Sequence, residues 1–304
     1  MENIDLTEIT NMVANKQFKE AKELLEKCAT NDEKHIEELK LLGLCNVNLE
    51  NYKEGQSNYE TVVKYRPDDA TSWFYLASCY DCQDDLLHAK TAYEEVIKLR
   101  ENYIEAYKCL CVIYVKEEEQ EKAIEIAQKA LEFEKEDYTL YYIIGTAYMS
   151  MRKFKESVEY LEKAIELNPD HSQLYNNIGT SYITIGNLDK AYENFLKATE
   201  LDPNYIDAYY NLGSILEYLK QDEAALAVFK QIILRKPDDY ESVYKAAELS
   251  KKLGEYDKAK MYLTLIPQDS LIGSRAKELA NSMDTDIPTA KAEQTQPKTY
   301  IDAA

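Results

Sequence analysis

The chain contains 304 residues, of which 45% are hydrophobic and 30% are charged, and its formal net charge at pH 7 is −20. An electrostatic field of this sign repels nucleic acids and anionic membranes, so it argues against both as partners and leaves solubility, or attraction of basic proteins, as its role. Glycine and proline are scarce, with 8 and 7 residues, which suits helices and argues against a β-rich fold.

The first residues, MENIDLTEITNM, lack the basic and apolar segments of a secretory signal peptide. No apolar run approaches the ~18 residues that a membrane-spanning helix needs. The 6 cysteines stand at irregular places, and in a chain without a signal peptide they are most simply reduced thiols. We therefore expect a cytoplasmic protein.

A period of 34 residues runs through the chain and is clearest in residues 172–205. Apolar residues at helical spacing, among them Tyr175 and Tyr182, predict a first amphipathic helix. Gly186 and the asparagine after it break this helix. A second apolar stripe follows and predicts a second helix, which ends before Pro203. The segment is therefore one helix–turn–helix hairpin.

The same period divides most of the chain into eight hairpin repeats without an insertion. In chain order these repeats are residues 2–35, 36–69, 70–103, 104–137, 138–171, 172–205, 206–239 and 240–273. Position 20 of each repeat has to be small, because the two helices of the hairpin approach each other there. It holds Ala21, Gly55, Ala89, Ala123, Ser157, Ala191, Ala225 and Ala259. All eight residues meet this requirement, so we treat the period as genuine.

This pattern resembles the tetratricopeptide repeat, whose 34-residue unit has an aromatic residue at position 4, glycine at 8, tyrosine at 11, alanine at 20 and proline at 32. The resemblance covers residues 2–273. It implies an all-α fold, in which hairpins stack as a right-handed α-solenoid because a single hairpin cannot bury both of its faces.

The two terminal repeats depart from the pattern. The first has Asp5 at position 4 and Glu8 at position 7, and the last has Val243 at position 4. Such departures are expected, because a terminal repeat has one face without a neighbour.

The residues after the last repeat predict a closing element and a tail. Leu271, Ile272 and Leu279 give an apolar face to a capping helix over residues 271–283. Residues 284–304 contain two prolines and many small polar residues, which predicts a disordered tail.

Four cysteines in neighbouring repeats raise the question of a metal site. Cys79 and Cys82 form a CxxC pair that can share one face of a helix, but Cys109 and Cys111 are two residues apart and point to nearly opposite sides. We therefore expect packing roles and no metal or cofactor, and keep a metal or redox role of Cys79 and Cys82 as an alternative. The 3 histidines show no ligand spacing, and no catalytic motif occurs.

The resemblance also implies where a partner would bind, because the first helices of tetratricopeptide repeats line a concave groove. The groove residues that we expect to contact a protein or peptide partner are Phe74, Tyr75, Tyr142, Asn176, Asn177, Tyr210, Asn211 and Tyr218. Asn177 and Asn211 share position 6, where amides can hydrogen-bond to a peptide backbone, as in the asparagine ladder of O-linked N-acetylglucosamine transferase.

A second known binding mode, the carboxylate clamp of heat-shock co-chaperones, is disfavoured. Lys40 and Lys108 stand at position 5 as the clamp requires, but Leu44 and Val112 occupy position 9, where it needs asparagine.

We therefore expect a non-enzymatic scaffold that takes an extended segment or a helix of a partner protein into its groove. An accessory or targeting subunit of a separate enzyme, such as a glycosyltransferase, is the alternative. The sequence carries no signal for an oligomeric state.

Overall fold

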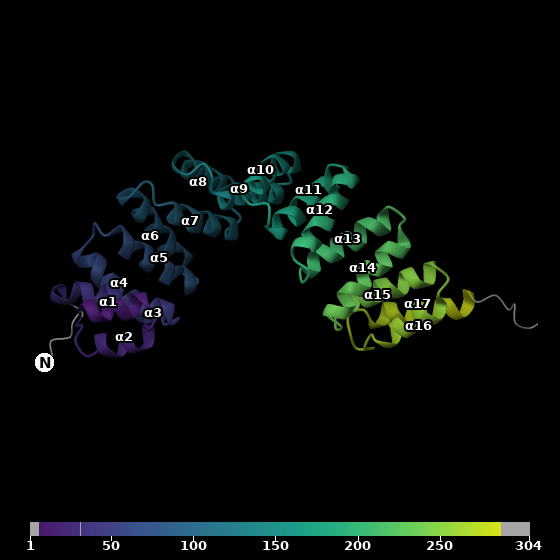
Figure 1. The fold of residues 1–304 in the computed structure, drawn as a ribbon, viewed down its shortest axis with the longest axis horizontal. Helices are drawn as coiled ribbons and strands as arrows, with labels where there is room; N and C mark the ends of the chain where they lie inside the picture. The colour runs from purple at the N-terminus through teal and green to yellow at the C-terminus, as the bar shows by residue number, and fades with distance from the viewer. Residues whose placement is uncertain (1–5, 31, 287–304) are drawn as a thin grey trace, which may run out of the picture. The chain divides into compact units, whose positions relative to one another are not determined.

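Residues 6–30 and 32–286 are described by a computed structural model, and all of their regular structure is helical. The chain divides into an N-terminal unit, Met1–Pro169, and a C-terminal unit, Asp170–Ala304. In both units the helices follow one another as packed pairs (Figure 1). We call the two helices of each pair the first and the second helix.

The N-terminal unit contains five helix pairs and a short 3₁₀ turn, η1 (Glu33–His35), within its described residues. Its helices are α1 (Leu6–Ala14), α2 (Phe18–Leu25), α3 (Ile36–Asn48), α4 (Tyr52–Tyr65), α5 (Ala70–Cys82), α6 (Leu86–Leu99), α7 (Ile104–Lys116), α8 (Gln120–Phe133), α9 (Tyr138–Ser150) and α10 (Phe154–Leu167). The second helices α2, α4, α6 and α8 also pack against the first helix of the next pair, so one hairpin covers the open side of another.

The described part of the C-terminal unit contains three helix pairs and one further helix. Its helices are α11 (Ser172–Thr184), α12 (Leu188–Leu201), α13 (Ile206–Tyr218), α14 (Asp222–Arg235), α15 (Tyr240–Lys252), α16 (Tyr256–Thr264) and α17 (Gly273–Asp286). The first helices α11 and α13 contact each other, and α17 packs against α15 and α16. A row of first helices therefore lies along one side of this unit.

In four hairpins, a glycine at position 8 receives a large side chain from position 24. A Cβ atom on Gly179 would lie 2.7 Å from the ring of Phe195, and one on Gly213 would lie 2.9 Å from the ring of Phe229. Both rings are fully buried. The glycine at position 8 therefore faces the ring at position 24. The alanine at position 20 of these two hairpins is also fully buried.

The turn inside each hairpin uses one residue in the left-handed region of the backbone. This residue is always position 15 of the repeat: Lys16, Glu50, Asp84, Glu118, Arg152, Gly186, Lys220 and Gly254, with φ between 60° and 82°. Only Gly186 and Gly254 adopt this conformation without steric cost from a Cβ atom. The fold thus imposes this turn conformation on six non-glycine residues as well.

The closing helix differs from its expected range of 271–283. Helix α17 begins at Gly273, because the backbone before it forms a turn in which Gly273 N–H donates to the Ser270 carbonyl. A Cβ atom on Gly273 would lie 2.3 Å from the carbonyl oxygen of Gln268, so the turn requires glycine. Leu271 consequently lies outside the helix and is fully exposed rather than part of an apolar face. The first five residues and most of the predicted tail, residues 287–304, lie outside the described residues.

Candidate functional site

Two of the aromatic residues predicted to bind a partner in the N-terminal unit pack against other aromatic rings of the repeats. Phe74 stacks on Tyr103 with 5.1 Å between ring centroids, and Tyr75 stacks on the buried ring of Tyr59 at 5.4 Å. Both side chains are half-buried. Tyr142 is also half-buried but lies on α9, two first helices further along the chain. The structure therefore brings Phe74 and Tyr75 together and leaves Tyr142 in a separate place.

In the C-terminal unit, the predicted asparagines join two neighbouring first helices. Asn211 on α13 donates a hydrogen bond from Nδ2 to Oδ1 of Asn176 on α11, over 2.8 Å. Asn176 is buried, while Asn177 and Asn211 are half-buried. The amide of Asn211 therefore links position 6 of one repeat to position 5 of the preceding one, and this link fixes its orientation.

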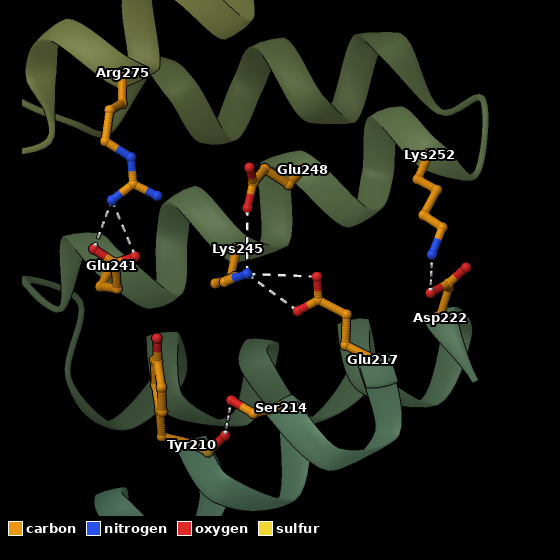
Figure 2. A network of polar contacts seen from close by, with 9 residues as sticks. All are labelled: Tyr210, Ser214, Glu217, Asp222, Glu241, Lys245, Glu248, Lys252 and Arg275. Carbon is orange, nitrogen blue, oxygen red and sulfur yellow. Dashed lines mark hydrogen bonds and ion pairs between the residues drawn. The ribbon is translucent and has the colours of Figure 1, made fainter. Parts of the chain in front are cut away.

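The two predicted tyrosines on α13 differ in exposure. The ring of Tyr210 packs edge-on against the buried Phe229, with 5.7 Å between centroids, and its hydroxyl end points toward α15 (Figure 2). Burial and the nearby Glu241 carboxylate raise the pKa of Tyr210, so its hydroxyl stays protonated at neutral pH. Tyr218 lies at the end of the same helix and is 68% exposed. It is the predicted site residue that projects furthest into solvent.

A network of ion pairs lies next to Tyr210, on α13, α15 and α17 (Figure 2). The ammonium of Lys245 lies 3.2 Å from Glu217 and 3.4 Å from Glu248. Burial acts to lower the pKa of Lys245, but the two carboxylates outweigh it and raise the pKa. Lys245 is therefore charged and engaged with acidic partners from two helices.

Two further pairs extend the network toward the end of the unit. Arg275 on α17 lies 3.3 Å from Glu241 and over the ring of Tyr244, 4.4 Å from its centroid. Lys252 on α15 lies 2.7 Å from Asp222 at the start of α14. The cations drawn in Figure 2 are thus each paired with a carboxylate of another helix. Arg275 is not among the residues predicted from the sequence, although it stands one 34-residue period after Glu241.

The two lysines that suggested a carboxylate clamp are engaged within the N-terminal unit. Lys40 lies 2.8 Å from Asp69, and Lys108 lies 3.0 Å from Asp137. Each aspartate also caps the next first helix, since its carboxylate accepts hydrogen bonds from backbone N–H groups at the helix start. Burial alone would raise the pKa of Asp137, but Lys108 and the cap hydrogen bonds lower it. These lysines therefore link the first helix of one repeat to the start of the next first helix.

The cysteines behave as packing residues. Cys79 is buried while Cys82 is exposed. Burial raises the pKa of the Cys79 thiol to about 12, and it does the same for Cys111, whose Sγ donates to the Ala123 carbonyl over 3.3 Å. Both thiols are therefore less acidic than an exposed thiol, which disfavours thiolate chemistry at neutral pH. Across residues 6–30 and 32–286, no three His, Cys, Asp or Glu side chains are grouped so as to hold a metal ion. Within the same ranges, no helix has the length and apolar character to cross a membrane.

Models of known protein families match the chain in the regions with the strongest period. Tetratricopeptide repeat models match residues 42–104, 138–171, 160–193 and 206–239, and a TPR repeat model matches residues 179–219. Together these matches cover more than half of the chain. The chain belongs to the tetratricopeptide repeat family. Its repeats are of a kind that binds protein or peptide partners, and its fold is that of a protein-interaction scaffold.

Solved structures of tetratricopeptide repeat proteins share this fold. YrrB, described as a TPR protein with an unusual peptide-binding site, is 26% identical, with a TM-score of 0.51 over 65% of this chain and 97% of YrrB. The pilF protein of Pseudomonas aeruginosa is 18% identical, with a TM-score of 0.58 over 70% of this chain and 98% of pilF. A tetratricopeptide repeat protein from Parabacteroides merdae is 15% identical, with a TM-score of 0.60 over 82% of this chain and 98% of that protein. No curated protein matches the chain in sequence.

Proposed function

We propose that this chain is a non-enzymatic scaffold that holds an extended segment or a helix of a partner protein against the first helices of its C-terminal unit. The observation that carries the proposal is the exposure of Tyr218, which is 68% accessible on a helix whose other predicted site residues are half-buried. A tyrosine offers a large apolar ring and a hydroxyl at little entropic cost, which is why tyrosines are common at the centres of protein interfaces.

The surroundings of Tyr218 indicate what kind of contact the partner would make. The neighbouring Glu217 carboxylate is neutralised by Lys245, and the amide of Asn211 is oriented by Asn176. The surface therefore offers a ring, a hydroxyl and an ordered amide rather than an excess of one charge. Such a surface suits a peptide backbone and apolar side chains. The peptide-binding site described for YrrB, a protein of similar fold, supports the same reading.

The proposal is tested by removing two groups from this surface. We expect the double substitution Tyr210→Ala and Asn211→Ala to weaken partner binding about tenfold, because it removes two central contacts worth roughly 1–2 kcal/mol together. Wild-type and variant proteins are compared in a pull-down, and the dissociation constant of the captured partner is then measured for both.

A matched control separates binding from folding. Leu234 on α14 is 76% exposed and belongs to a second helix, so Leu234→Ala should leave both helicity and affinity unchanged. If the double variant bound the partner as tightly as the wild type, with equal helicity by circular dichroism, the first helices of this unit would not be the binding surface.

We also retain the cytoplasm as the proposed compartment, since free thiols such as the buried Cys45, Cys79 and Cys111 are typical of reducing surroundings.

A further inference from the structure

A second surface of the N-terminal unit is shaped to receive a side chain. A groove of about 300 Å³ opens between the second helices α4 and α6, and α5 forms its floor. Its walls are mainly apolar and include Val63, Trp73, Leu76 and Ala92. The groove thus lies on a different face of α5 from the one that carries Phe74. A role of this groove in binding is independent of the function proposed above.

The groove is open because a small residue stands where the following repeats have large ones. Ala92 occupies position 23 of its repeat, and the same position holds Ile126 and then Tyr160 in the next two. Ile126 packs against the core cluster that contains Leu110, the equivalent of Leu76. Tyr160 packs against the next cluster, and its hydroxyl accepts a hydrogen bond from Gln128 on the preceding second helix. In both later repeats the chain fills the equivalent space with its own side chain.

A lysine accompanies the filling residue in each of these repeats. The ammonium of Lys122, at position 19, lies 5.5 Å from the ring centroid of Tyr114, and that of Lys163, at position 26, lies 5.3 Å from the ring of the filling residue Tyr160 itself. At the open groove, position 19 is His88, where the next repeat has Lys122. The His88 ring stacks on that of Tyr80, with 5.2 Å between the centroids. An apolar side chain with a cation beside an aromatic ring is therefore the combination that fits this kind of space.

The rim of the open groove offers an acceptor for such a cation. The exposed Glu60 lines the groove, and its Oε1 accepts hydrogen bonds from the Tyr80 hydroxyl over 2.9 Å and from Gln56 over 2.8 Å. His88, at 61% exposure, faces the Asp85 carboxylate at 2.8 Å. The one lysine among the lining residues, Lys64, lies 5.3 Å from the ring of Tyr65. The net charge of −20 adds a long-range attraction for basic segments.

We propose that this groove binds a basic segment of a partner protein, in which an apolar side chain enters over Ala92 and a neighbouring lysine or arginine lies at Glu60 and the ring pair of Tyr80 and His88. The partner's apolar side chain takes the place that Ile126 fills in the next repeat, and its cation takes the place of the Lys122 ammonium.

Trp73 makes the proposal directly measurable, because it lines the groove and is the single tryptophan of the chain. The probe is the peptide acetyl-Gly-Lys-Leu-Lys-Gly-amide, titrated into the full chain while Trp73 fluorescence and the NMR shift of its indole N–H are followed. We expect saturable changes in one or both signals, with a dissociation constant on the order of 1 mM for so small a contact. The same peptide with glutamate in place of lysine should bind at least tenfold more weakly.

Two variants decide whether the groove is responsible. Ala92→Ile fills the space as Ile126 does, and His88→Lys places a competing cation at the exposed rim as Lys122 does; each should weaken binding of the lysine peptide at least tenfold. His88 is exposed, so its variant keeps the fold even if Ala92→Ile proves overpacked. Absence of a saturable change in both signals, or equal binding by the wild type and the His88→Lys protein, would overturn the proposal.

Discussion

At the scale of single residues, small side chains decide where large ones can go. The space at Gly179 is taken by the ring of Phe195, and the space at Gly213 by that of Phe229. Ala92 shows the opposite case. It is small at position 23, where the next two repeats have Ile126 and Tyr160, and a groove remains open above it. Whether a small residue makes a tight contact or an open groove therefore depends on what stands opposite.

The first prediction at this scale concerns Gly179. Replacing it with leucine should destabilise the C-terminal unit by about 1–3 kcal/mol or more, because even a Cβ atom would lie 2.7 Å from the ring of Phe195. Thermal unfolding followed by circular dichroism measures the effect. Ala224, exposed on α14, provides the control, and Ala224→Leu should leave the unfolding temperature within a degree or two of the wild type. Equal unfolding temperatures for the two variants would contradict the packing described above.

At the scale of elements, the turn between the paired helices is fixed by backbone conformation rather than by residue type. Position 15 has a positive φ in all eight repeats, yet it is glycine only at Gly186 and Gly254. The left-handed conformation costs a non-glycine residue about 1–2 kcal/mol. Stacking of the helices must outweigh this cost in the other six repeats.

The turn gives a prediction with an unusual sign. Glu118 has φ of 61°, so Glu118→Gly should raise the free energy of unfolding by about 0.5–1 kcal/mol, after allowing for the greater freedom of glycine in the unfolded chain. Glu159, exposed within α10, is the matched control, and Glu159→Gly should lower the free energy of unfolding by about 1 kcal/mol. Chemical denaturation measures both. A loss of stability in both variants would show that the strain at Glu118 is negligible.

Ion pairs add a second kind of link between elements. Lys245 with Glu217 connects two consecutive repeats, and Lys40 pairs with Asp69, the residue that caps the first helix of the next repeat. Exposed pairs contribute little stability, but here the aspartate is also a helix cap, so one carboxylate satisfies two requirements. The pairs also compensate the carboxylates of Glu217 and Glu241 near Tyr210 (Figure 2), whereas the whole chain carries a net charge of −20.

At the scale of the whole molecule, the period of the sequence was enough to predict the family and the all-helical fold. The requirement for a small residue at position 20 is local, and it can be read at Ala123 or Ala225 without knowing any contact. The first helices begin at Ile36, Ala70, Ile104, Tyr138, Ser172, Ile206 and Tyr240, which open the repeats of that period. Hairpin position is therefore encoded one repeat at a time.

The period of the sequence does not predict which side chains of neighbouring repeats contact each other. Asn177 and Asn211 share position 6, but the period did not indicate that Asn211 also donates a hydrogen bond to Asn176 at position 5 of the preceding repeat. The pairing depends on the stagger between α11 and α13, which residue types do not reveal. Arg275 and the groove at Ala92 were missed for the same reason, because each becomes visible only when side chains of two or three helices are placed together. The role of the predicted partner-binding residues accordingly stays a prediction.

The most direct test of the central claim is tyrosine footprinting of this chain alone and in complex with a captured partner. Tyr218 is 68% exposed on the first helix α13, and Tyr192, half-buried on the second helix α12, serves as the internal reference. If the first helices of the C-terminal unit bind the partner, labelling of Tyr218 should slow at least tenfold in the complex while that of Tyr192 stays the same. Unchanged labelling of Tyr218 in a saturated complex would contradict the claim.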